Sequence, residues 1–172
     1  SFCTLLRTFY QANTTMGGKG SHACIWGLLL SEKDITPILA GTVAFYVASF
    51  VCYAVIFAGA WTRAICVDKG VKTFEGIKQR YGMGLCSLAT VLSAAGKSAA
   101  ILAVINVIGK QADSLCMYMQ AACVVLAATA TVAHNQFWEQ RPLPLIFISG
   151  VSEAVCLSLA AYAMWAATHN VN

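Results

Sequence analysis

The feature that most restricts how this chain can fold is an apolar stretch from Met83 to Gly109, long enough to cross a lipid bilayer. A helix needs about 20 apolar residues to span the hydrocarbon core. Three further apolar blocks lie at residues 37–61, 114–133 and 143–167. The chain is 59% hydrophobic and only 10% charged, whereas soluble domains carry about 25% charged residues. The sequence therefore predicts an all-α integral membrane protein, a single bundle of four transmembrane helices over residues 37–167.

Lys97 lies near the middle of the 83–109 stretch. A lysine at the centre of a membrane helix costs about 3 kcal/mol on insertion scales, so we expect a partner for its charge. Glu153, in the 143–167 block, is the only other full charge at comparable depth. At about 1.5 Å per residue, the two residues lie about 21 and 15 Å from the same side of the bilayer, a difference that the lysine stem can cover. We therefore predict a structural intramembrane ion pair between Lys97 and Glu153.

Local signals indicate where the spans begin and end. Thr36 and Pro37 suit the N-cap and first position of a helix. Gly109 suits a helix C-cap and Asp113 an N-cap, so the second and third spans are predicted to form a tight antiparallel hairpin. The four tryptophans fall at predicted interfaces, where their rings sit at headgroup level. These are Trp26, Trp61, Trp138 and Trp165.

Residues 1–36 form a polar arm before the spans, and residues 168–172 form a short tail after them. Within the arm, residues 23–31 are apolar but too short to cross the bilayer, so we expect an interfacial helix there. Asn13 begins a glycosylation sequon. Cys3 and Cys24 could form a disulfide if this arm lies in an oxidising compartment.

Residues 63–82 are the most basic part of the chain. Val71, Phe74 and Ile77 recur at helical spacing among charged residues, which predicts a short amphipathic helix lying on the membrane. The basic excess places this loop on the cytoplasmic or matrix side. Nucleic-acid binding is not predicted, because no basic run carries interleaved aromatic residues. The residues expected to contact anionic lipid headgroups are Arg63, Lys69, Lys72, Lys78 and Arg80.

Small and polar side chains share one face of each predicted span. Membrane helices pack through such residues, because lipid provides no hydrophobic drive between helices. The faces carry Tyr46, Ser49 and Tyr53 on the first span, Thr90, Ala94 and Lys97 with Ser87 beside them on the second, Cys116, Gln120, Cys123 and Thr131 on the third, and Ser149, Glu153 and Cys156 on the fourth. We expect these faces to meet in a polar bundle interior. The residues assigned to that interior are Gln120, Thr131, Ser149 and Cys156.

The sequence carries no recognisable catalytic, cofactor or metal motif. Its histidines, His22, His134 and His169, lie outside the middle of the spans, so the chain alone does not supply two facing haem ligands. The GGKG stretch at residues 17–20 lacks the Walker pattern. No His, Cys, Asp and Glu cluster has metal-site spacing. We therefore expect a protein that is not an enzyme and holds no cofactor, with structural lipids around it.

These observations favour a non-catalytic accessory subunit of a larger membrane complex, with other membrane protein subunits as partners. The predicted location is an energy-transducing organelle inner membrane, mitochondrial or thylakoid. One alternative is a free-standing tetraspan scaffold or trafficking protein of the secretory pathway, which a glycan on Asn13 would support. Another is a small proton- or ion-conducting protein that uses Lys97 and Glu153.

Overall fold

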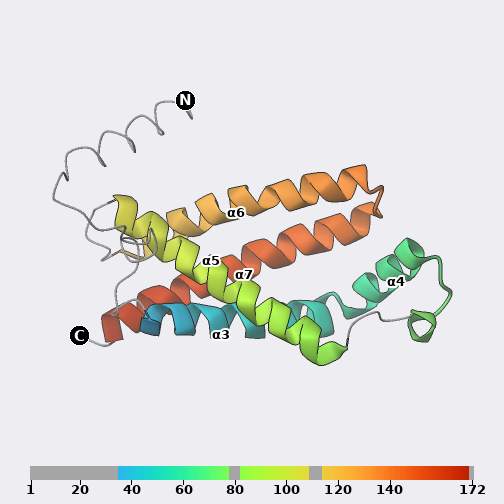
Figure 1. The fold of residues 1–172 in the computed structure, drawn as a ribbon, viewed down its shortest axis with the longest axis horizontal. Coiled ribbons are helices and arrows are strands. Elements are labelled where there is room, and N and C mark those ends of the chain that lie inside the picture. The colour runs from blue at the N-terminus through green and yellow to red at the C-terminus, as the bar shows by residue number, and fades with distance from the viewer. Residues whose placement is uncertain (1–34, 78–81, 109–113, 171–172) are drawn as a thin grey trace, which may run out of the picture.

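The computed structural model describes residues 35–77, 82–108 and 114–170, and every regular element in these ranges is a helix (Figure 1). Four segments are long and apolar enough to cross a membrane. These are α3 (Ile35–Val51) with the π-helix η2 (Cys52–Ile56) that continues it, α5 (Met83–Ile108), α6 (Leu115–Trp138) and α7 (Leu143–Asn170). The expectation of an all-helical chain with four apolar helices of spanning length is confirmed for the described residues.

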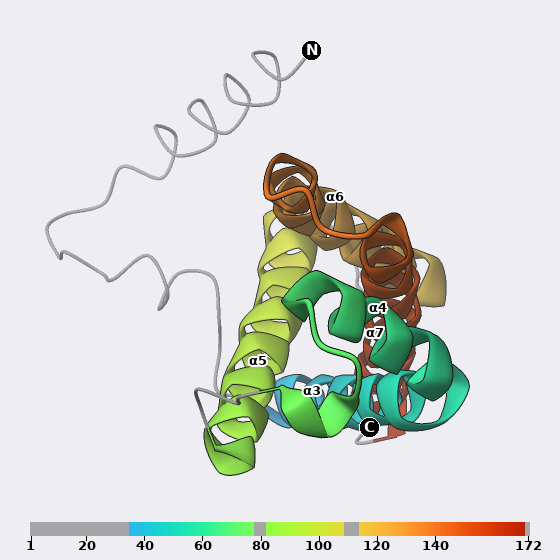
Figure 2. The same ribbon diagram turned by 90° about the vertical axis from the view of Figure 1, so that its right-hand side faces the viewer.

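The four long helices stand at the corners of a four-sided arrangement in the order α3, α5, α6 and α7 (Figure 2). α3 and α6 run in one direction, and α5 and α7 run in the other (Figure 1). Each helix packs against its two neighbours, most extensively α3 against α7, whereas α5 and α7 lie diagonally opposite and touch little. A contact between side chains of α5 and α7 therefore passes through the middle of the bundle.

The first apolar segment ends earlier than residue 61. α3 widens into the π-helix Cys52–Ile56, and the helix breaks at Phe57, whose backbone angles are φ −104° and ψ 6°. A separate helix, α4 (Ala58–Lys69), follows and lies beside one end of the bundle (Figure 1). The chain stays apolar on both sides of Phe57, so its composition does not reveal the break. Trp61 consequently belongs to α4 and not to the first span.

The third and fourth helices run past their expected ends at residues 133 and 167. α6 continues to Trp138 and α7 to Asn170, so most of the expected tail at 168–172 is helical. Most of the added residues are polar, and none is a glycine or a proline, so the helix continues. Hydropathy reports the edge of the lipid-like stretch, not the end of the helix. Several earlier expectations fall outside the described residues. These are the arm with its 23–31 helix, the Asn13 sequon, the Cys3–Cys24 pair and the turn between α5 and α6.

The expected amphipathic helix over residues 71–78 is wrong for the part that the structure describes. α4 ends at Lys69 and is capped by Gly70, which adopts the left-handed conformation with φ 63° and donates its backbone N–H to Val67 O. This is the usual helix stop, because glycine alone adopts that conformation without steric cost. Only a single 3₁₀ turn, η3 (Phe74–Gly76), follows. The stop at Gly70 overrides the helical spacing of the apolar residues beyond it.

The interior of the bundle is filled by apolar side chains from all four long helices, for example Phe45, Ile101, Tyr118 and Leu157, each at most 4% exposed. Large apolar side chains also cover the outside, as a chain surrounded by lipid requires. Leu39, Phe50, Leu92 and Phe147 are all at least 60% exposed.

α3 approaches its neighbours most closely at Gly41. A β-carbon at this position would lie 2.6 Å from Met164 Cγ on α7 and 2.8 Å from Ser98 Oγ on α5. Glycine is therefore needed here for the close approach of three helices. Gly96 has no atom within 4 Å of the corresponding position, so it plays no such part.

Candidate functional site

Lys97 and Glu153 meet inside the bundle. Lys97 Nζ of α5 lies 2.5 Å from Glu153 Oε1 of α7, and the two side chains are 20% and 25% exposed. Oε1 receives no hydrogen bond of regular geometry from a described residue, so the attraction between the groups is that of an ion pair. Because α5 and α7 are diagonal partners with little direct packing, this ion pair is the polar link between them.

A third helix completes the surroundings of the lysine. Its Nζ lies 4.7 Å from the centre of the Phe45 ring on α3, a cation–π contact with a ring that is only 4% exposed. Cys52 and Cys156, buried to 2% and 1% exposure, lie next to each other and within electrostatic reach of the pair. The ammonium and carboxylate groups are thus held among an aromatic ring and two thiols, contributed by α3, η2 and α7.

The local sequence explains why the lysine reaches this position. On α5, Ala94 and Ser98 are almost fully buried, and their small side chains leave room for the long lysine stem between them. On α7, Ser152 and Cys156 flank Glu153 and are each 1% exposed. Two hydroxyls of this set, Ser98 Oγ and Ser152 Oγ, have no hydrogen-bond partner among the described residues.

The four residues assigned to the polar interior divide into two groups. Cys156 is buried and Ser149 half-buried, but Gln120 and Thr131 are exposed on the outer face of α6. That assignment is wrong for α6, whose inward face is apolar and carries Tyr118, Ala121 and Val125. The buried serines at 98 and 152 are the polar interior residues that the reasoning from periodicity missed.

Of the residues expected to contact anionic lipids, the structure describes three. They lie on α4 or shortly after it. Arg63 is exposed, and its Nε donates to Gly59 O at 3.2 Å. Lys69 is exposed beside Asp68, at 3.2 Å, and Lys72 is exposed too. Lys78 and Arg80 lie outside the described residues. The described basic residues are therefore free to reach headgroups, although Asp68 partly offsets the charge of Lys69.

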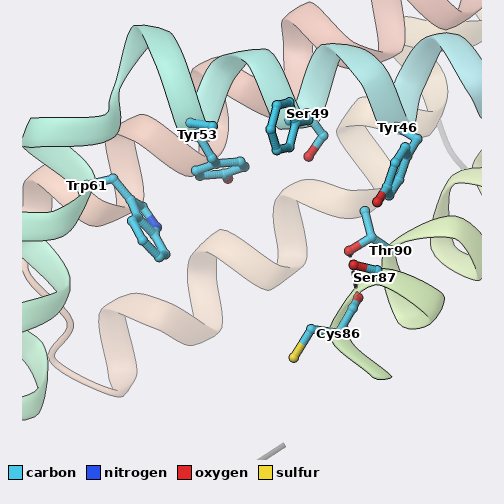
Figure 3. Close-up of a pocket in the computed structure, with 9 residues that line it drawn as sticks. Tyr46, Ser49, Tyr53, Trp61, Cys86, Ser87 and Thr90 are labelled. Atoms are coloured by element: carbon cyan, nitrogen blue, oxygen red, sulfur yellow. Dashed lines mark hydrogen bonds between the residues drawn. The ribbon is translucent and has the colours of Figure 1, made fainter. Parts of the chain in front are cut away.

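A second polar region lies between α3 and α5. It is a cavity of about 390 Å³ whose walls are contributed by α3, η2, α4 and the first turns of α5 (Figure 3). The lining residues are Tyr46, Ser49, Phe50, Tyr53, Ala54, Trp61, Cys86, Ser87 and Thr90. The polar faces of the first two spans carry the signal for this region, but periodicity alone does not show that they border a cavity.

The fold and these two sites define the class of the molecule, a helical bundle of the transmembrane type with an ion pair in its interior. The chain belongs to the family described as protein of unknown function (DUF1761), whose model matches residues 36–165. The matched range contains all four long helices except the ends of α3 and α7, and both polar sites. No curated protein and no solved structure matches the chain.

Proposed function

We propose that this chain is a non-catalytic accessory subunit that packs laterally against other subunits of a membrane complex through the outer face of α6. The observation that most directly supports this proposal is the position of Gln120. Its side-chain amide is exposed on α6, a helix of membrane-spanning length. It makes no hydrogen bond with a described residue. An amide left in lipid without a partner is costly, so a neighbouring protein surface is its natural environment.

The rest of this face supports lateral packing. At about 100° per residue, Cys116, Gln120, Cys123 and Thr131 fall on one stripe of α6, opposite the buried residues Tyr118 and Val125. Ala127 lies on the same stripe and is exposed. Small side chains with one strong hydrogen-bonding group are typical of contacts between membrane helices, because they permit close approach of the backbones.

In this proposal the Lys97–Glu153 pair holds the bundle together and takes no part in chemistry. The complex is assigned to an energy-transducing organelle membrane, with the basic residues 63–82 on the matrix-like side, as their charge bias favours. Subcellular fractionation tests the location. A glycan on Asn13 would contradict it and favour the secretory alternative.

Cross-linking through native cysteines tests the partner surface. Cys123 lies on the proposed contact face, whereas Cys86 is exposed on α5, away from it. One variant retains Cys123 and the other retains Cys86 as its sole exposed cysteine among the described residues. Both are treated with a short bismaleimide in native membranes. We expect a defined cross-linked band from Cys123 and none from Cys86.

A matched pair of substitutions tests the energetic contribution of the amide. Gln120→Leu should release the chain from its assembly after mild detergent extraction. Ser158→Ala should not, because this exposed serine on α7 already donates to Ala154 O at 2.8 Å. Recovery of the wild-type chain as a lone monomer, or equal behaviour of the two variants, would refute the proposal.

One observation favours a second candidate function, proton or ion conduction. The side chains of Lys97 and Glu153 are 20% and 25% exposed, so the pair is not sealed from its surroundings. Proton flux into vesicles that contain the purified chain measures this directly. Flux that persists in the Lys97→Met, Glu153→Leu double variant would exclude the pair as the pathway.

A further inference from the structure

The cavity between α3 and α5 is lined by uncharged groups only. Its nine lining residues provide four aromatic rings and several hydroxyls but no lysine, arginine, aspartate or glutamate. A site that binds a phosphate or carboxylate normally offers a cation or a cluster of backbone N–H groups. The chemistry of the lining therefore points to a neutral ligand.

Several hydroxyls of the lining have no hydrogen-bond partner in the described part of the chain. Tyr46, Ser49 and Tyr53 make no hydrogen bond with another described residue. In Figure 3 the side chains of Tyr46 and Tyr53 extend from α3 and η2 toward the space in front of α5, where Ser87 and Thr90 lie. Groups of this kind within a membrane-spanning segment need a water or a ligand oxygen, because lipid offers no hydrogen bond.

The aromatic wall of the cavity is fixed in place. The rings of Tyr53 and Trp61 meet edge to face at 6.1 Å, and Trp61 packs on Phe74 at 5.8 Å. These contacts join η2, α4 and η3 across the break at Phe57, so the break is what turns Trp61 toward the cavity. A rigid aromatic wall favours a flat ring over a flexible acyl chain.

The size and depth of the cavity agree with a ring at the polar end of a lipid. A cavity of about 150 Å³ holds a benzene molecule, so about 390 Å³ holds about two rings. Ser87 and Thr90 lie four and seven residues beyond the start of α5 at Met83, which places these two side chains within about 10 Å of that helix end. This is the depth at which the oxygen-bearing ring of a membrane lipid resides.

From these observations we propose that the cavity between α3 and α5 binds a neutral, ring-bearing lipid, with its hydroxyl or carbonyl oxygen toward Tyr46 and Ser87. The rest of the bound lipid extends through the open side of the cavity into the bilayer. A sterol and a quinone share this chemistry. A diacyl phospholipid does not, because its phosphate would find no cation in the lining.

Photolabelling of the full-length chain in phosphatidylcholine nanodiscs tests the proposal. The probes are a diazirine sterol, a diazirine quinone analogue and, as the acyl control, a diazirine phosphatidylcholine. At least one ring probe should label residues 46–61 and 86–90, and its unlabelled parent should compete. The identity of that probe shows which source supplies the ring. Equal labelling of these segments by the phosphatidylcholine probe, or labelling without competition, would overturn the proposal.

A variant and its control add an energetic test. Tyr46→Phe with Ser87→Ala removes two hydroxyls with almost no change of shape, and labelling should fall about tenfold, as expected for two neutral hydrogen bonds. Ser158→Ala removes an exposed hydroxyl on α7 and should leave labelling unchanged. Unchanged labelling in the double variant would refute the assignment. Competition in the wild-type chain decides the question even if the double variant does not fold.

Discussion

Removing one charge of the Lys97–Glu153 pair should destabilise the bundle more than removing both charges together. The two charged groups lie 2.5 Å apart, and at this distance opposite charges attract by about 7 kcal/mol at an effective dielectric constant of about 20. Because the side chains are 20% and 25% exposed, part of this attraction is screened, and we expect a coupling energy of about 4 kcal/mol. Lys97→Met or Glu153→Leu alone should each cost about 3 kcal/mol, since either leaves a charge without its partner.

The double variant is the decisive measurement. Lys97→Met with Glu153→Leu should cost only about 2 kcal/mol, less than either single change and well below the sum of about 6, because no uncompensated charge remains. The assay is unfolding by SDS titration in mixed micelles, followed by far-UV circular dichroism. Ser158→Ala, at an exposed position on α7, is the control variant and should unfold at the same SDS concentration as the wild type. Additive costs in the double variant would show that the two side chains do not stabilise each other.

Four further substitutions follow from the packing. Gly41→Ala should destabilise the bundle by about 1–3 kcal/mol in the same assay, because its new methyl group would crowd α5 and α7. Gly96→Ala, in open space, should be neutral or stabilising by up to about 1 kcal/mol, and equal effects at the two glycines would refute this reasoning. Tyr118→Phe should cost about 1 kcal/mol through loss of its 3.0 Å hydrogen bond to Thr168, measured as a lower SDS midpoint. Phe45→Leu should lose about 1 kcal/mol more in the wild type than in the Lys97→Met variant, the difference being the cation–π contact.

The sequence predicts the long helices well because membrane-spanning length is a strong signal. It also identifies Lys97 and Glu153, since two isolated charges at matching depth in lipid have few other partners. The same reasoning fails at Phe57. Hydropathy averages over many residues, and a π-turn followed by a break changes the direction of the chain without changing its composition. The cavity beside that break was therefore beyond the reach of periodicity.

The error at Gln120 and Thr131 has a different cause. Helical periodicity shows which residues share a face, but it does not show whether that face turns inward or outward. In a soluble protein the polar face would turn outward by default. In a membrane both environments are apolar, so a polar face turns toward whichever protein surface can satisfy it. On α7 that surface is the bundle interior around Glu153. On α6 the proposed function assigns this role to another subunit, because the polar face is exposed there.

The diagonal position of the ion pair explains why a charged pair is retained where apolar residues would also pack. α5 and α7 share little direct contact, so ordinary packing constrains their relative height only through α3 and α6. A slide of α5 by one helical turn would move Lys97 about 5.4 Å along the bundle. The apolar contacts of α5 could re-form after such a slide, but the charge would lose both Glu153 and the Phe45 ring. The pair thus selects one register among several that packing alone would permit. It fixes the height of α5, and with it the position of Ser87 and Thr90 opposite Tyr46 across the cavity.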